Sequence, residues 1–564
     1  MVSLADVRAW NPGALDEICS TLRARTQILI NDGDDYGKVM PVEGWTGPAA
    51  DSAADQHRAH MRGLDSIAAG AAALGKAVGQ AADAILGVQA AVKNADELAR
   101  KYGFAITADG AIVCVYADQP PPELHPEDRA RAQAQLTDDV AQILRTANDI
   151  DADLATVLDR AAAGQFGTGD ESTVAAAAAD GLKGPGLTLP EPPAGATPAQ
   201  NAAWWATLSP AGRDILLRDR PGAIGAMDGL PGSVRDTANR AVLHQQRADL
   251  QREREDLRHR LDGVKRSDPA QQREYHELSN QLETLGTKIA SLDSVQATMD
   301  KGGRQLLYLD ASKPRVEAAI AVGNIDTARN VAVFTPGFTT SVNGDLGNYD
   351  RNMDDLKKEA GRMDDRYGGG PTATVTWIGY QAPQWDGIAD PSQSVLTPDA
   401  ARAGGESLAK FYNGIGAGHE ASNTPLHLTA LGHSYGSTTT GYALGHDTPV
   451  QDAMLFGSPG QGTDHLKVPE GHLFAEQDSG DTLVPNYGNT GALGPSPYFS
   501  PDASSYHQMS TDASITEAGP RNAAEGHSGY LDAQSTSMYN MAAITTGHAD
   551  LAQYKGTVYA DGPR

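Results

Sequence analysis

Short apolar runs, each bounded by Gly, Pro or Asp, follow one another from about Gln305 onward in this chain of 564 residues. They are QLLYLD, VEAAIAVG, VAVFTPG, ATVTWIGY, LHLTALG, AMLFGSPG and HLFAEQD. Helical stretches separate several of them, notably residues 352–363 and 400–413. Strands that alternate with helices predict an α/β domain with a mainly parallel sheet covered by helices on both faces. In such sheets, catalytic groups collect on loops at the carboxyl ends of the strands.

One of these runs leads directly into a G-x-S-x-G pattern centred on Ser434, within LHLTALGHSYGST (residues 426–438). At a sharp turn between a strand and a helix the serine takes a strained backbone conformation, so its close neighbours must lack a Cβ. The hydroxyl then projects at the top of the sheet, where the N-terminus of the following helix stabilises negative charge. The apolar strand before the turn and the Ser/Thr-rich helix start after it indicate that Ser434 is a nucleophile.

A serine nucleophile needs a base and an acid that orients the base, and in this fold they follow in the order Ser, acid, His. The run HLFAEQD leads into a turn that holds Asp478 and Asp481. Asp481 is preferred because its D-x-x-V-P turn resembles the acid loop of many hydrolases that use a Ser, acid, His order. Asp478 stays open as the alternative. His527, in a Gly-flanked loop before the final helices, is the predicted base, and His507 is the second choice.

Acyl transfer also requires donors for the oxyanion, and two backbone amides are predicted to supply them. One belongs to Tyr435, the residue after the nucleophile. The other belongs to Phe338, with Thr339 as the next choice, because Gly337 permits a turn where the strand VAVFTPG ends. No metal or cofactor is implied: Cys19 and Cys114, the two cysteines, lie far apart and outside any His-rich context.

The remainder of the chain is predicted to be helical. In residues 1–163 a helix over 12–30, a loop, and a long Ala-rich helix over 49–102 are followed by a short strand or hairpin at 111–116. A second helical region follows three prolines (residues 120–122). Residues 164–200, rich in Gly, Pro and Ala, predict a linker. Residues 201–300 predict a helical segment with an antiparallel hairpin whose second arm starts at Pro269, and residues 301–564 form the catalytic domain.

The net charge of −27 and the pI near 4.8 argue against a nucleic-acid partner and against adsorption to anionic lipid. The start, MVSLADVRAWNPG, lacks the basic and apolar regions of a signal peptide. The most apolar stretch, residues 67–91, is interrupted by Lys76, Gln80 and Asp83, so no transmembrane segment is expected. We therefore expect a cytoplasmic protein.

The ordered motifs TPGFTT, TWIGYQAP, GHSYGS, FGSPGQG and GHSGY resemble the actinobacterial α/β-hydrolase family once catalogued as DUF1023. Residues 204–240 also resemble the segment that precedes the hydrolase core in that family. The resemblance implies serine-hydrolase chemistry. The expected partner of the predicted triad is a small-molecule or lipid acyl substrate. Gln381 departs from the family pattern, which has Asp in a YDAP-like turn, and this puts a polar role of that turn in doubt.

The N-terminal half is similar to a WXG100-type helical hairpin, with Trp45-Thr46-Gly47 at the bend. That similarity implies a link to type VII (ESX) secretion, a WXG100-type protein partner, and export without a signal peptide. Against it, W-x-G triplets also begin at Trp377 and Trp385, and no Y-x-x-x-D/E tail follows the second helix. Two interpretations result. The first is a serine hydrolase, carboxylesterase or lipase-like, with an acyl-enzyme mechanism. The alternative is a secretion-associated or interaction protein whose hydrolase domain is secondary or inactive.

Overall fold

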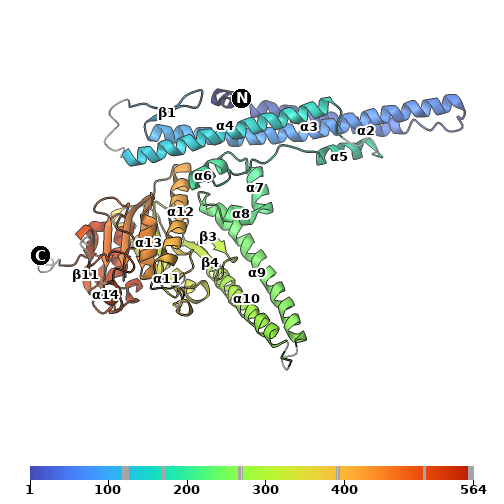
Figure 1. Ribbon diagram of the computed structural model, residues 1–564. Coiled ribbons are helices and arrows are strands. Elements are labelled where there is room, and N and C mark those ends of the chain that lie inside the picture. Colours follow the sequence, from blue (N-terminus) through green and yellow to red (C-terminus); the bar gives the residue numbers. More distant parts are fainter. Residues whose placement is uncertain are drawn as a thin grey trace. The chain divides into compact units, whose positions relative to one another are not determined.

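The computed structural model describes residues 1–116, 126–166, 172–264, 268–269, 271–388, 390, 394–488, 490–499 and 504–556. The chain divides into two compact units, Met1–Ile215 and Leu216–Arg564 (Figure 1). Helix α7 (Pro210–Asp219) crosses the boundary between them. None of the described helices combines the length and the hydropathy that a membrane span needs.

The first unit is a set of helices packed along one very long central helix. Its elements are α1 (Leu4–Ala9), α2 (Pro12–Gly37), α3 (Pro48–Lys101), β1 (Phe104–Ile106), β2 (Ile112–Cys114), α4 (Pro126–Ala162), α5 (Val174–Lys183) and α6 (Pro198–Ala206). Helix α3 contacts α2, α4 and α5, and its buried face consists mostly of alanines, which allow close helix contacts (Figure 1). The short strands β1 and β2 pair as an antiparallel hairpin.

Two features of this unit differ from the sequence prediction. Helix α2 continues to Gly37, beyond its predicted end at residue 30. The reason is a tertiary contact: a Cβ on Gly33 would lie 2.2 Å from a methyl group of Val174, so the extra turns pack tightly on α5. Helix α5 in turn lies within residues 164–200, predicted to be a linker, where it buries Val174 and Ala178 against Ala68 and Ala72 of α3. Residues 117–125, which follow on from the hairpin, and residues 167–171 of the predicted linker lie outside the described residues.

The second unit contains an eight-stranded sheet in the order β10-β9-β8-β7-β5-β6-β4-β3. Its strands are β3 (Arg304–Asp310), β4 (Glu317–Val322), β5 (Asn330–Thr335), β6 (Thr372–Ile378), β7 (His427–His433), β8 (Val450–Phe456), β9 (Leu473–Glu476) and β10 (His507–Met509). In this spatial order, each pair of neighbours from β10 to β6 is parallel, and that stretch includes β5. Strand β4 pairs antiparallel with both β3 and β6. The predicted mainly parallel sheet is thus confirmed.

Helices cover both faces of this sheet, so most side chains of its central strands are buried, including polar ones such as Thr374, Thr376 and Thr429. Helices α11 (Val342–Tyr367) and α15 (Thr536–Thr545) pack on one face, and α12 (Asp399–Ala421) and α13 (Tyr435–Leu444) pack on the other. In β5, Ala332 and Phe334 face α11 and α15. Val331 and Val333 face α12 and α13. The fold is therefore an α/β-hydrolase-like sandwich whose parallel strands end at one common edge.

A helical hairpin precedes the sheet and projects from it (Figure 1). It consists of α9 (Gly232–Gly263) and α10 (Gln272–Met299), after the short helix α8 (Pro221–Gly225). Val242 of α9 and Val295 of α10 belong to the hydrophobic core beneath β3, so they attach the hairpin to the sheet. Leu257 and Leu285 form a separate cluster between the two helices. These two helices stand where the hairpin is predicted, and the second begins at Gln272 rather than at Pro269.

A buried carboxyl at the end of β9 gives this unit a pH-dependent stability. Glu476 is fully buried and accepts hydrogen bonds from Ser537 Oγ and, at 2.7 Å, from Asn540 Nδ2. Burial raises the pKa of Glu476 from its ordinary 4.5 to about 7. The folded protein therefore binds the proton of the Glu476 carboxyl more tightly than the unfolded chain does. The stability that this proton adds to the folded state is fully present below pH 4.5 and is lost as pH rises through 7.

We therefore expect Glu476→Gln, which is neutral at every pH, to have a higher Tm than the wild type at pH 8 but a similar Tm at pH 4.5. The expected difference at pH 8 corresponds to at most about 3 kcal/mol. Thermal unfolding of both full-length proteins at the two pH values measures it. Glu525→Gln is the control, because Glu525 is exposed. A Tm difference for Glu476→Gln that is the same at both pH values would contradict the prediction.

Candidate active site

Ser434 lies at the sharp turn between β7 and α13, with φ 55° and ψ −134°. This left-handed backbone conformation is strained for a residue with a side chain. The glycines on either side are required by close approaches: a Cβ on Gly436 would lie 2.2 Å from the Thr335 carbonyl oxygen, and one on Gly432 would lie 2.7 Å from Ser437 Cα. The G-x-S-x-G segment therefore has the geometry expected of a nucleophile elbow.

A continuous hydrogen-bond chain starts at this serine. His527 Nε2 lies 2.8 Å from Ser434 Oγ, and His527 Nδ1 lies 2.8 Å from Asp481 Oδ2. Since the carboxylate can only accept, Nδ1 carries the hydrogen and Nε2 accepts from the serine hydroxyl. Burial favours a raised pKa for Asp481, but the hydrogen bond and charge of His527 and the hydrogen bond from Tyr530 outweigh it, and the pKa is lowered. The acid is thus held as a carboxylate against the imidazole.

Asp478, the alternative acid, lies in the same turn but makes different contacts. Its Oδ2 accepts from the backbone amides of Gly480 at 2.9 Å and Gly526 at 2.8 Å. Its own amide donates to the Tyr530 hydroxyl at 2.9 Å, and that hydroxyl donates to Asp481 Oδ2 at 3.1 Å. Asp478 therefore anchors the loop that carries His527, and Tyr530 links the two aspartates.

The amides predicted for the oxyanion lie on two segments that meet at Gly337. A Cβ on Gly337 would lie 2.7 Å from Ser434 Cβ and 2.9 Å from the Tyr435 nitrogen, so glycine keeps the space beside that amide open. The Thr339 amide, the second choice, already donates to the Pro383 carbonyl at 2.9 Å. Among the described residues the Phe338 amide has no backbone bond of this kind, so it stays available as a donor.

The profile of a family described as alpha/beta hydrolase matches residues 311–488. An uncharacterized protein of Mycobacterium tuberculosis (strain ATCC 25618 / H37Rv) is 33% identical over 325 residues, which cover 52% of this chain and 46% of that relative. The chain thus spans under half the length of that relative. A second uncharacterized protein of the same strain is 35% identical over 219 residues, which cover 37% of this chain and 79% of that relative. An uncharacterized protein of Mycobacterium bovis matches to the same extent. The chain belongs to the α/β-hydrolase family.

His507, the second candidate for the base, lies elsewhere in the hydrolase unit. It is in register with Phe474 on the neighbouring strand, and its ring packs against Phe474 and Tyr554. Of the two predicted histidines, the structure brings His527 to Ser434.

Two residues of the hydrolase site are not singled out by the sequence analysis. His433 is buried, its Nε2 lies 2.8 Å from the backbone oxygen of His527, and burial lowers the pKa of His433 to about 3. The neutral ring therefore donates Nε2–H to that carbonyl and fixes the loop. Gly457 has φ 53°, and a Cβ there would lie 3.2 Å from His527 Cε1 and 3.3 Å from Asp481 Oδ2. His433 belongs to the motif GHSYGS and Gly457 to the motif FGSPGQG, and these motifs are the sequence signal for both residues.

Gln381, which departs from the family pattern, has a clear polar role. Its Nε2 donates to the Arg315 carbonyl at 3.0 Å and to Glu317 Oε1 at 2.7 Å, and its Oε1 accepts from the Arg315 amide at 3.2 Å. The amide supplies both donors and acceptors, whereas a carboxylate would only accept. Glutamine therefore ties this turn to the start of β4.

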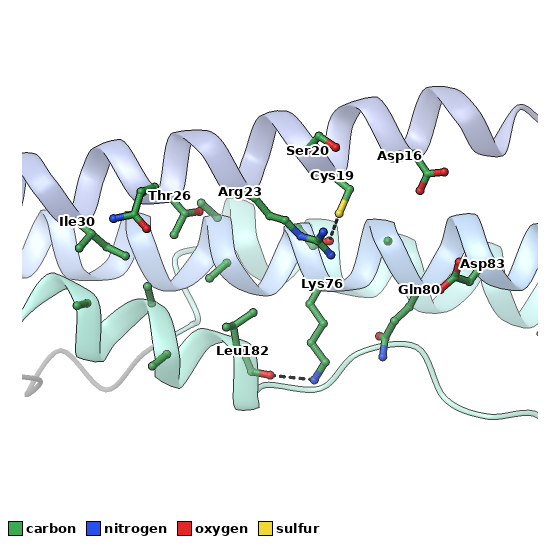
Figure 2. Close-up of a pocket in the computed structure, with 18 residues that line it drawn as sticks. Asp16, Cys19, Ser20, Arg23, Thr26, Ile30, Lys76, Gln80, Asp83 and Leu182 are labelled. Carbon is green, nitrogen blue, oxygen red and sulfur yellow. Dashed lines mark hydrogen bonds between the residues drawn. The ribbon is translucent and has the colours of Figure 1, made fainter. Parts of the chain in front are cut away.

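A cavity of about 770 Å³ lies in the helical unit between α2, α3 and α5, apart from this chemistry (Figure 2). Two of its polar groups bond within the protein: Cys19 Sγ donates to the Gly75 carbonyl at 3.1 Å, and Lys76 Nζ donates to the Leu182 carbonyl at 2.9 Å. Within the described ranges, no three His, Cys, Asp or Glu side chains cluster in a way that could hold a metal ion.

Proposed function

We propose that this α/β-hydrolase is a serine hydrolase, carboxylesterase or lipase-like, that cleaves ester bonds through an acyl-enzyme. The observation that supports this is the unbroken hydrogen-bond chain from Ser434 through His527 to Asp481. The positive-φ turn at Ser434, whose side chain is part-buried, and the Tyr435 and Phe338 amides beside it support the other two requirements, a nucleophile held at a turn and an oxyanion site.

In the proposed reaction, Ser434 Oγ attacks the ester carbonyl carbon while His527 Nε2 takes the hydroxyl proton. The amides of Tyr435 and Phe338 donate to the oxyanion of the tetrahedral intermediate. The C–O bond then breaks, and His527 gives its proton to the leaving alcohol. Water attacks the acyl-enzyme in the same way, with His527 again as base, and the acid leaves. Asp481 holds the imidazole orientation and stabilises its positive charge.

A fluorophosphonate probe tests the proposal because it phosphonylates only an activated serine. We expect the folded full-length protein to gain one adduct, located by peptide mapping at Ser434, and Ser434→Ala to gain none. Ser528→Ala is the matched control: Ser528 is exposed and adjacent to His527, and labelling should persist. The proposal fails if the wild type stays unlabelled or if Ser434→Ala is labelled equally.

The link between the helical unit and WXG100-type proteins stays a prediction. Helices α2 and α3 do form a hairpin with Trp45 at the bend, and Trp45 is exposed. A type VII secretion role would require co-purification with a small WXG100-type protein or recovery of the chain from culture filtrate.

A further inference from the structure

Two large apolar side chains of the hydrolase unit remain in contact with solvent on segments next to Ser434. Trp385 is 72% exposed and Leu396 is 47% exposed. Single exposed apolar side chains are common on protein surfaces, so the significance of these two depends on where they stand in the chain. The position of these two side chains relative to the nucleophile indicates which ligand they serve.

Trp385 is fixed to the loop that carries the Phe338 amide. Its ring lies edge-on to the Phe338 ring, with centroids 4.7 Å apart and planes at 73°. Two hydrogen bonds hold the adjoining backbone in place: the Thr339 amide to the Pro383 carbonyl at 2.9 Å, and Gln384 Nε2 to the Thr340 carbonyl at 3.2 Å. A Cβ on Gly337 would lie 2.7 Å from Ser434 Cβ, so the Phe338–Trp385 ring pair belongs to the loop that packs against the nucleophile turn.

Leu396 stands on a segment that is hydrogen-bonded to Tyr435, the residue after the nucleophile. The next residue, Thr397, accepts a hydrogen bond through its carbonyl from the Tyr435 hydroxyl at 2.7 Å. The same hydroxyl accepts from the Ala401 amide at 3.1 Å. Tyr435 directly follows Ser434 and is buried, so its ring fixes the segment on which Leu396 stands.

We propose that Trp385, Phe338 and Leu396 bind the hydrocarbon chain of the substrate's acyl group. The inference rests on the proposed ester hydrolysis and names its substrate class: esters of medium-chain or long-chain fatty acids rather than acetyl esters. Every methylene that leaves water on this surface in the transition state raises kcat/KM by at most about fourfold.

The test measures kcat/KM of the full chain on p-nitrophenyl acetate, butyrate and octanoate. We expect the wild-type ratio of octanoate to acetate to exceed about tenfold. Trp385→Ala should lower that ratio by about tenfold, mainly through KM, Leu396→Ala should lower it less, and Trp385→Phe should restore most of it. Ile515→Ala is the matched control, because Ile515 is 81% exposed on β11 (Ser514–Thr516), which pairs with β12 (Gly519–Arg521), and its ratio should equal the wild-type ratio.

Fluorophosphonate labelling of the wild type separates the two claims. If Ser434 is labelled but Trp385→Ala keeps the wild-type ratio, or if the wild type prefers acetate, the acyl-chain inference is overturned and the serine-hydrolase proposal stands. If Ser434 is not labelled, the proposed function fails and the inference fails with it. A lowered ratio in Trp385→Ala and Leu396→Ala, with Ile515→Ala unchanged, supports the inference.

Discussion

His527→Gln is expected to lower kcat for p-nitrophenyl ester hydrolysis by about 10⁵-fold to 10⁶-fold. At neutral pH a serine hydroxyl is a weak nucleophile, and His527 Nε2, at 2.8 Å from Ser434 Oγ, is placed to take its proton. Glutamine has a similar reach but an amide that cannot accept and return a proton. The same variant should therefore also react slowly with a fluorophosphonate probe. Steady-state kinetics and the labelling rate measure the two effects.

His507, the second histidine that the sequence suggests as a base, provides the control for this prediction. His507→Gln should change kcat by less than about threefold, because the His507 ring packs against Phe474 and Tyr554 rather than against Ser434. Its effect should instead appear as a lower Tm. If His507→Gln inactivates the enzyme and His527→Gln does not, the base has been assigned to the wrong histidine.

The position of Ser434 could be predicted from the sequence because its structural requirements are local. A strand, a turn with glycines at 432 and 436, and a helix start are all encoded within one short segment. The mostly apolar runs indicate the strands in the same way, because a sheet covered on both faces buries nearly every strand position, even where a threonine such as Thr374 or Thr429 stands. Local patterns of this kind do not depend on distant contacts, so they can be recognised without a structure.

What the sequence could not determine depends on contacts between distant segments. The end of α2 depends on Gly33 packing against Val174, and the role of Gln381 depends on the backbone of Arg315. The choice between Asp478 and Asp481 is of the same kind. Both aspartates stand in one turn with similar neighbours, and only the loop that follows 46 to 48 residues later distinguishes them.

That distinction leads to the second large effect. Asp481→Asn is expected to lower kcat by about 10⁴-fold with little change in KM. An amide nitrogen in place of Asp481 Oδ2 would donate to His527 Nδ1 and favour the tautomer with hydrogen on Nε2. In that tautomer the imidazole cannot accept the Ser434 proton, even though the side chains keep their positions. The loss of the carboxylate also removes the charge that stabilises the imidazolium.

Asp478→Asn is the matched variant, since it removes the same charge from the same turn. Asp478 Oδ2 accepts from two backbone amides, and an amide oxygen can accept from both. We therefore expect kcat to fall by less than about tenfold, with a lower Tm as the anchor of the His527 loop weakens. Measuring kcat and Tm for both variants separates a residue that sets the tautomer of the base from one that holds its loop. The reverse order of the two kcat values would transfer the acid role to Asp478, because a loop anchor alone cannot account for a 10⁴-fold loss in a protein that stays folded.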